Sequence, residues 1–329
     1  MADRALLIVN PTASGLDGSA AERVVVALAP AFAVETVTTE ARGHATALAR
    51  AAAARGVDVV AVLGGDGTVS EAADGLAGTA TALTPLPAGV TNVFARTLGA
   101  RSDPVAAARL LAARVPAARA VDLGLVNGRH FLFSSGVGLS AQIMAEAEAE
   151  PDRKASLGQL HFTAAGVSVV ARRYLRDPPR LRVQAVDGRT EEGITVVVQN
   201  GDVLTYFGPR GIRVCEGAGL RTGSLSLTVL RAARARNVPG VLARLVTGRA
   251  ASVTAHPLVG ALPSTAAATV TSTDGTPLPV EADGEYLGEH VRVEYGVAPG
   301  ALRVLGYRPE RIIAGSLAAS DGRSRRERR

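Results

Sequence analysis

The sequence predicts an α/β nucleotide-binding layer followed by an antiparallel β domain. The chain has 329 residues, of which 47% are hydrophobic, so it can bury a sizeable core and form about two domains. Up to about residue 111, short β-branched runs alternate with alanine-rich amphipathic stretches, which is the βαβα pattern of a parallel sheet. After residue 119 the helical pattern becomes scarce and apolar/polar alternation takes over, which favours antiparallel strands.

The first half of the chain contains four short apolar runs, each closed by glycine, proline or asparagine, with amphipathic stretches between them. We expect strands at Ala5–Val9, Phe32–Thr38, Asp58–Leu63 and Ala82–Leu86, and helices near Ser19–Leu28, His44–Arg55, Val69–Leu76 and Pro104–Ala113.

The second half shows nine alternating runs and one helical stretch. We expect strands at Val121–Val126, Phe131–Ser134, Arg180–Val186, Ile194–Val198, Leu225–Leu230, Ala251–Thr254, Ala268–Thr273, Val291–Tyr295 and Leu302–Leu305. A helix is expected from about Leu157 to Leu175 as a cover over a sheet edge or cleft. We therefore predict a nucleotide domain over residues 1–120, a β-rich domain over residues 121–308, and a basic, disordered tail over residues 309–329.

Composition excludes several classes of protein. The single cysteine, Cys215, cannot form an internal disulfide, and the five histidines show no zinc-ligand spacing. Lys154 is the only lysine and lies outside any P-loop or protein-kinase context, so a phosphate site must use backbone amides, arginine or metal. No apolar run approaches the ~18 residues of a membrane span, and the first residues show no secretory signal, so we expect a cytoplasmic protein.

The formal net charge of +6 suits an anionic partner. The chain has no tryptophan and few other aromatic residues, so it lacks the stacking platforms of single-strand nucleic-acid binders. We expect an acidic membrane face rather than nucleic acid as the partner. The basic tail 323–329 can act as a weak electrostatic tether to anionic lipid.

The strongest local feature is Gly64-Gly65-Asp66-Gly67-Thr68, which stands between an apolar strand and a helix. The glycines let backbone amides approach an anion, and the helix N-terminus adds its positive dipole end. Asp66 would repel phosphate unless a cation bridges them or the carboxylate accepts a proton from a substrate hydroxyl. The alternative is a tight turn in which Asp66 and Thr68 cap the helix.

Two further loops follow predicted strands, Asn10-Pro11-Thr12-Ala13-Ser14-Gly15 and Pro87-Ala88-Gly89-Val90-Thr91-Asn92. In an open parallel sheet, ligands bind beyond the carboxyl ends of the strands, so we expect the three loops to converge on one edge. Thr91 or Asn92 can equally be an ordinary helix N-cap.

A third segment, Val280–Gly288, carries acids at Glu281, Asp283 and Glu285. In extended geometry these carboxylates would crowd one face, which raises pKa values or attracts a cation. Asp283-Gly284 is also a good hairpin turn, and Glu285 would then leave on the return strand and project into a cleft.

Together these segments resemble the diacylglycerol kinase catalytic-domain family. The matching motifs are Val9-Asn10-Pro11 with Ser14-Gly15, Gly64 to Glu71, Pro87 to Arg96, and Asp283-Gly284-Glu285, and their order and spacing extend to about Leu305. NAD kinases and phosphofructokinases share a similar Gly-Gly-Asp-Gly, but four motifs in register favour the diacylglycerol kinase family.

The resemblance implies a soluble, bacterial-type lipid kinase with a Rossmann-like domain of the NAD kinase/diacylglycerol kinase type, a C-terminal β-sandwich domain, and ATP between them. It also implies that Glu285 is the proton acceptor, with Asp283 beside it and Asp66 as a second candidate for the base or for a metal contact. The nucleotide contacts it implies are Asn10, Pro11, Thr12, Ser14, Thr39, Gly64, Gly65, Asp66, Gly67, Thr68, Val69, Ser70, Thr91 and Asn92. ATP and Mg²⁺ fit this chemistry, because phosphoryl transfer needs positioning and charge neutralisation more than covalent chemistry.

Two departures from the family stand out. Val93 occupies a position where many relatives carry an acid. The loop 220–225 resembles one in which Leu220, Thr222 and Ser224 would hold a structural Mg²⁺, but it carries a neutral threonine where the family usually has aspartate.

We expect an ATP-dependent kinase that phosphorylates diacylglycerol or a related lipid while peripherally associated with the inner membrane face. A sphingoid base, ceramide and polyprenol offer the same kind of hydroxyl. A homodimer is compatible with the sequence. The alternatives are a non-catalytic nucleotide- or lipid-binding protein and, third, an NAD kinase.

Overall fold

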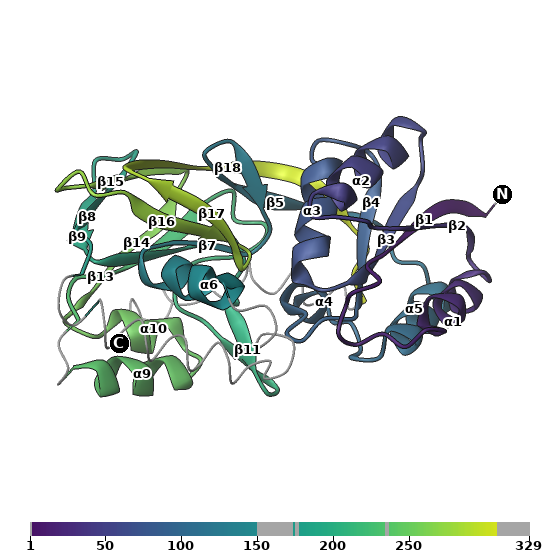
Figure 1. The fold of residues 1–329 in the computed structure, drawn as a ribbon, viewed down its shortest axis with the longest axis horizontal. Helices are drawn as coiled ribbons and strands as arrows, with labels where there is room; N and C mark the ends of the chain where they lie inside the picture. Colours follow the sequence, from purple (N-terminus) through teal and green to yellow (C-terminus); the bar gives the residue numbers. More distant parts are fainter. Residues whose placement is uncertain (1, 150–173, 175–177, 234–236, 308–329) are drawn as a thin grey trace, which may run out of the picture. The chain divides into compact units, whose positions relative to one another are not determined.

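The computed structural model describes residues 2–149, 174, 178–233 and 237–307. It forms two compact units: the first comprises Met1–Leu123 and the segment from Pro299 onward, and the second comprises Gly124–Ala298. Figure 1 shows the elements of both units.

The first unit is built on a parallel sheet in the order β2-β1-β3-β4-β18. The strands are β1 (Asp3–Val9), β2 (Phe32–Thr38), β3 (Val59–Gly64), β4 (Ala82–Pro87) and the end of β18 (Arg292–Val304); the helices are α1 (Ala20–Leu28), α2 (His44–Ala54), α3 (Asp66–Leu76), α4 (Val93–Thr97) and α5 (Pro104–Ala113). The four strands and four helices expected before residue 114 are confirmed, with α4 in addition.

Helices pack on both faces of this sheet, as its continuous apolar strands require. α1 and α5 contact each other and share a core with alternate residues of β1 and β3, such as Leu7 and Ala61. The intervening residues, such as Ile8 and Val62, are also fully buried, and α3 packs beside α2 against β3 and β4. The first unit is therefore a doubly wound α/β layer.

The second unit contains two sheets that are antiparallel within the unit. One has the order β14-β13-β10-β7-β16-β17, and the other joins β18, β15, β8 and β9 with β5 and β6 at its side. The strands are β5 (Arg119–Val126), β6 (Arg129–Phe131), β7 (Ser134–Val137), β8 (Leu181–Ala185), β9 (Thr190–Gly193), β10 (Thr195–Gln199), β13 (Leu225–Leu230), β14 (Val259–Thr265), β15 (Ala267–Ser272), β16 (Leu278–Ala282) and β17 (Glu285–His290); a separate hairpin pairs β11 (Thr205–Phe207) with β12 (Arg210–Ile212).

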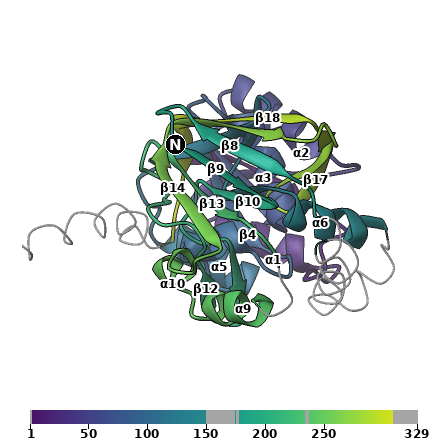
Figure 2. The same cartoon turned by 90° about the vertical axis from the view of Figure 1, so that its left-hand side faces the viewer.

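The two sheets bury a common core, so the second unit is a β-sandwich. Val196, Leu227 and Val280 of the first sheet pack with Val183 and Val270 of the second. Because side chains alternate along a strand, the intervening residues of β10 and β13 face the other way. On that side lie α6 (Leu139–Ala149), α9 (Val238–Val246) and α10 (Ala250–Thr254), the last two packed on each other; Figures 1 and 2 show this pair beside the sheet.

Some sequence predictions for the second unit are wrong. The segment 251–254, expected as a strand, is the helix α10, in which only Val253 is buried. The strands expected at Val291–Tyr295 and Leu302–Leu305 belong to one strand, β18, which runs from Arg292 to Val304. Within it, Gly300 takes a positive φ of 62° and donates its N–H to the Asp122 carboxylate. The helix expected from about Leu157 to Leu175 falls outside the described residues, except for Tyr174. No helix in the described part of the chain is long and apolar enough to cross a membrane.

Candidate active site

Three loops meet at the carboxyl ends of the parallel strands in the first unit. The Asn10 amide donates to the Thr68 hydroxyl at 2.9 Å, which links the loop after β1 to the start of α3. The Gly15 N–H donates to the Ala88 carbonyl at 2.9 Å, which links the first loop to the loop after β4. Thr39 at the end of β2 donates its N–H to Val9. The predicted nucleotide-contact residues therefore come from adjoining strand ends, as expected for a ligand edge.

Glycine is required where the second and third loops touch. A Cβ atom built on Gly89 would lie 2.7 Å from the Cα of Gly65, closer than nonbonded carbons approach. Likewise, a Cβ on Gly15 would lie 2.9 Å from the Ala88 carbonyl oxygen. The glycines thus allow backbone to approach backbone, and this contact holds the loops beside the N-terminus of α3.

Asp66 ties the glycine loop to the third loop. Its two carboxylate oxygens accept hydrogen bonds from the N–H groups of Val93 at 2.9 Å and Phe94 at 3.1 Å, the first residues of α4. Burial raises the pKa of Asp66, whereas these N–H donors, the Thr91 hydroxyl and the charge of Arg96 act in the opposite direction. The carboxylate caps a neighbouring helix, so these contacts give Asp66 a positioning role.

In the second unit, β16 and β17 form the acidic hairpin. Asp283 and Gly284 take positive φ values of 50° and 81°, as a tight two-residue turn requires. The buried Asp283 carboxylate accepts N–H groups from Leu132 at 2.6 Å, Phe133 at 2.9 Å and Ser134 at 3.2 Å. The single strand expected at Phe131–Ser134 is divided at this point into β6 and β7. Asp283 thus fixes the hairpin to the adjoining segment.

Glu285 is the least buried of the three acids and lies on the return strand, as predicted. Its side chain is 17% exposed, and both carboxylate oxygens pair with the guanidinium of Arg129 in a two-point ion pair. Arg129 was not predicted from the sequence. It follows the Asn127-Gly128 turn between β5 and β6, more than 150 residues away from its partner, and no local pattern signals this contact.

Glu281 is buried, and its carboxyl contacts α6 and the hairpin turn. Its Oε1 accepts the Ser140 hydroxyl at 3.3 Å, and its Oε2 accepts the Gly284 N–H at 3.1 Å. Gly136 leaves room for this carboxyl, since a Cβ there would lie 2.8 Å from Oε1. Burial raises the pKa of Glu281 to about 8, and the charge of Asp283 adds to this rise, whereas the two hydrogen bonds lower it.

The raised pKa of Glu281 predicts a pH-dependent stability. Between its ordinary value of 4.5 and about 8, the folded chain binds this proton more tightly than the unfolded chain. The free energy of unfolding should therefore fall as pH rises through this window, by up to about 1.4 kcal/mol per pH unit. In urea unfolding at pH 5, 6, 7 and 8, Glu281→Gln should flatten this slope, whereas the exposed Glu289→Gln should not. Equal slopes for all three proteins would contradict the prediction.

The residues predicted to hold a structural Mg²⁺ do not fit that ion. The Thr222 hydroxyl lies 3.0 Å from the Gly219 carbonyl oxygen and 2.9 Å from that of Ser224, so it closes the loop with hydrogen bonds. Leu220, Thr222 and Ser224 offer no carboxylate, the ligand that protein Mg²⁺ sites usually supply. Across the described residues, no group of three or more His, Cys, Asp or Glu side chains could hold a metal ion.

This hydroxyl-closed loop predicts that Mg²⁺ alone leaves the protein's thermal stability unchanged. We expect equal melting temperatures in EDTA and in millimolar Mg²⁺, without nucleotide. In Thr222→Asp, the melting temperature should rise when Mg²⁺ is added. The rise should be about 2–4 °C for each kcal/mol that Mg²⁺ binding adds to the free energy of unfolding. Thr222→Asn, which adds no charge, is the matched control. A Mg²⁺-dependent shift in the wild-type protein that Thr222→Val abolishes would contradict this account.

Comparison with known proteins gives matches over both units. Residues 4–126 match the diacylglycerol kinase catalytic domain, and residues 134–306 match the YegS C-terminal NAD kinase beta sandwich-like domain. The chain is 31% identical to a probable lipid kinase YegS-like of Pseudomonas aeruginosa (strain UCBPP-PA14) over 273 residues. These aligned residues are 80% of this chain and 81% of that relative.

Two further matches concern part of the sequence and the fold. The diacylglycerol kinase of Bacillus subtilis (strain 168) is 35% identical over 142 residues, which are 42% of this chain and 46% of the relative, so this match spans about half of that protein. A crystal structure of a diacylglycerol kinase from Bacillus anthracis strain Sterne has the same fold, with a TM-score of 0.67 at 22% identity over 94% of this chain and 98% of that one.

Proposed function

We propose that this chain transfers the γ-phosphate of ATP to the hydroxyl of diacylglycerol or a related lipid. The chain belongs to the diacylglycerol kinase-like lipid kinase family. The observation that carries the proposal is the convergence of the three strand-end loops of the first unit at the N-terminus of α3. The lipid acceptor is inferred from the names of the relatives. The roles in nucleotide binding and proton transfer are inferred from the residues of this chain.

The first unit supports ATP binding through its backbone. The first-turn N–H groups of α3, at Asp66, Gly67 and Thr68, have no intrahelical carbonyl to which they can donate. Such amides, together with the positive end of the helix dipole, favour phosphate. The buried Thr68 and Ser70 hydroxyls lie in the same helix, and Asn10 is held against Thr68. We assign the nucleotide phosphates to this helix terminus.

The second unit supports proton transfer through Glu285. A carboxylate that accepts the hydroxyl proton makes the lipid oxygen a better nucleophile while it attacks the γ-phosphorus. Arg129 orients this carboxylate with its planar fork, which pairs with both oxygens. Asp283 positions the hairpin and, with both oxygens accepting backbone N–H groups, has a structural role.

Mg²⁺ enters the proposal only with ATP, where it would neutralise phosphate charge during transfer. The groups proposed to face the phosphates are backbone N–H groups and hydroxyls. The Asp66 carboxylate is not among them, because it accepts the first N–H groups of α4. The net charge of +6 is consistent with work at an anionic membrane face, to which we propose that the protein associates peripherally from the cytoplasm.

The test is transfer of label from γ-labelled Mg-ATP to a panel of acceptors in anionic mixed micelles. The panel contains diacylglycerol, a sphingoid base, ceramide, a polyprenol and, in a separate aqueous assay, NAD. Label in one of the lipids supports the proposal and names the substrate class. Label in NAD alone would replace it with NAD kinase activity. ATP binding without transfer to any acceptor would favour a non-catalytic binding protein.

A further inference from the structure

The hairpin of β11 and β12 in the second unit ends in an exposed aromatic ring. Phe207 and Arg210 are the last residue pair of the hairpin, and Gly208-Pro209 is the loop between them. The Phe207 residue is 74% exposed. The other phenylalanines among the described residues are buried, namely Phe32, Phe94, Phe131 and Phe133. The hairpin tip therefore leaves in water a ring of the kind that the chain elsewhere buries.

The turn at this tip is tight and has little freedom. Gly208 takes a positive φ of 56°, and the ring of Pro209 restricts its own φ to negative values near −65°. A positive φ followed by a negative one in a two-residue loop is the type II′ turn of β-hairpins. Since opposite residues of an antiparallel pair project from the same face, Phe207 and Arg210 lie side by side at the end of the hairpin.

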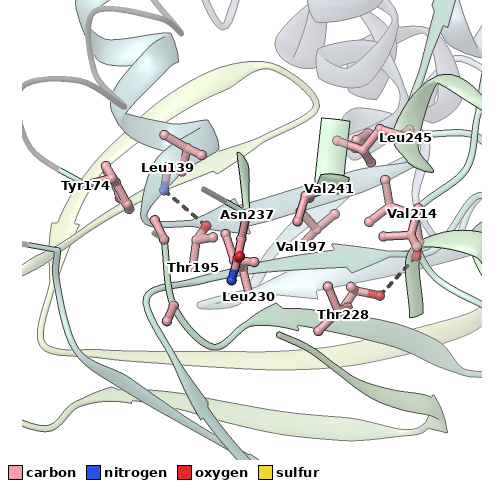
Figure 3. A pocket seen from close by; sticks show the side chains of 15 residues that line it. Leu139, Tyr174, Thr195, Val197, Val214, Thr228, Leu230, Asn237, Val241 and Leu245 are labelled. Atoms are coloured by element: carbon pink, nitrogen blue, oxygen red, sulfur yellow. Dashed lines mark hydrogen bonds between the residues drawn. The ribbon is translucent and has the colours of Figure 1, made fainter. Parts of the chain in front are cut away.

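The base of the hairpin is anchored in the second unit. Ile212 lies two residues before Val214, and its partly buried side chain packs against the apolar cluster that contains Val214 and Cys215. The Thr228 hydroxyl of β13 donates to the Val214 carbonyl at 3.1 Å. Figure 3 shows this bond, with Leu245 of α9 close to Val214. The tip thus projects from a fixed base.

Arginines surround the exposed ring. A Cβ atom built on Gly248 would lie 2.8 Å from a carbonyl oxygen of β12, so the turn after α9 abuts the hairpin. Figures 1 and 2 show the hairpin beside α9 and α10. Arg249 follows this turn and is exposed, as are Arg210 and Arg213 of the hairpin segment. Asp202 pairs with Arg213 at 3.1 Å, so this group of side chains keeps a net positive charge.

An exposed ring beside several guanidinium groups matches the chemistry of an anionic bilayer surface. At such a surface an aromatic side chain can leave water for the boundary between headgroups and acyl chains. Arginine extends its aliphatic stem along apolar groups, while its guanidinium pairs with lipid phosphates. The negative surface potential of the bilayer adds an attraction for each arginine close to it.

We propose that this surface, the docking tip, binds an anionic bilayer with the Phe207 ring inserted among the lipids. The docking tip comprises residues 207–210 with Arg213 and Arg249. The inference deepens the proposed membrane association by naming the surface that makes it. It rests on the proposed function only in treating the bilayer as the source of the lipid substrate, because docking requires neither ATP nor phosphoryl transfer.

The first test places a fluorescent reporter at the tip. The chain has no tryptophan, so Phe207→Trp creates a protein with one. Its emission should shift to shorter wavelength with vesicles of equal parts phosphatidylglycerol and phosphatidylcholine, and lipids brominated on their acyl chains should quench it. Val26→Trp, at an equally exposed position of α1, should show neither change. Unchanged Phe207→Trp emission on vesicles that bind the protein would overturn the proposal.

The second test measures affinity by sedimentation with the same vesicles. Phe207→Ala should weaken binding by about fivefold or more, since the buried ring is lost. Arg210→Gln should weaken it by about fivefold, the contribution of one arginine near an anionic surface. Val26→Ala and Arg50→Gln make the same changes at exposed positions of the first unit and should leave binding unchanged. No binding by the wild-type protein, or equal binding by all of these proteins, would overturn the proposal.

A kinase assay on substrate-loaded vesicles separates the two proposals. If Phe207→Trp inserts but no lipid is phosphorylated, the docking tip stands and the proposed function fails. If a lipid is phosphorylated and Phe207→Ala changes neither vesicle binding nor the KM for lipid, the proposed function stands and the docking tip fails. Analytical ultracentrifugation without lipid tests another occupant. A wild-type dimer that Phe207→Ala converts to a monomer would assign the tip to a second copy of the chain and overturn the proposal.

Discussion

Replacing Glu285 by glutamine should abolish phosphoryl transfer and leave ATP binding intact. Glutamine keeps the size of the side chain but cannot accept a proton at neutral pH, so the lipid hydroxyl would have no base. Loss of a general base lowers turnover by about 10²–10⁴-fold. The nucleotide loops belong to the first unit and the hairpin to the second, so the dissociation constant for ATP should stay within about twofold of the wild-type value. Isothermal titration and labelled-phosphate transfer measure the two quantities.

Two control variants separate the base from its surroundings. Glu289→Gln makes the same change at an exposed position of the same strand and should retain full activity. Arg129→Gln breaks the ion pair but keeps the carboxylate, and it should leave more activity than Glu285→Gln. Turnover by Glu285→Gln at a tenth of the wild-type rate or more would refute the assignment, and equal losses in the Arg129 and Glu285 variants would make the ion pair the essential feature.

Replacing Asp66 by asparagine should destabilise the first unit and weaken ATP binding together. The amide presents one acceptor oxygen and one NH₂ group to two backbone N–H donors, so at least one buried N–H of Val93 or Phe94 loses its partner. An unpaired buried donor costs about 1–3 kcal/mol. Because α4 follows the third loop, its displacement should also raise the dissociation constant for ATP at least tenfold. Thermal unfolding and ATP titration provide the two readouts.

The same variant decides between the two roles considered for Asp66. A positioning residue should lower stability and ATP affinity, whereas a catalytic base would lower turnover with both of these unchanged. Asp3→Asn, at an exposed position of the same unit, is the matched control for the change of chemistry. An Asp66→Asn protein with wild-type melting temperature and ATP affinity but no turnover would contradict the positioning role.

The first unit could be predicted almost entirely from the sequence. Its central strands are apolar on both faces, as Leu6 to Val9 and Val59 to Leu63 show, and its helices are amphipathic, so these elements carry their own local signal. The convergence of the three loops followed from a topological rule about strand ends, and the contact of Asn10 with Thr68 agrees with it.

The second unit was harder to predict because its contacts join distant residues. The helix α10 has β-branched residues at Val253 and Thr254, and its packing on α9 overrides their strand propensity. The end of β18 joins the first unit by pairing Arg303 with Ala82, which no local pattern signals. The ion pair of Arg129 with Glu285 and the carboxylate contacts of Asp66 and Asp283 likewise depend on tertiary structure.

The most direct measurement is the amount of label that enters the lipid phase from γ-labelled Mg-ATP, with α-labelled Mg-ATP as the paired control. The chosen acceptor is short-chain diacylglycerol in anionic mixed micelles, with the wild-type and Glu285→Gln proteins side by side. We expect label from the γ position only, and only with the wild-type protein. No transfer to diacylglycerol or any other lipid by a wild-type protein that binds ATP would contradict it.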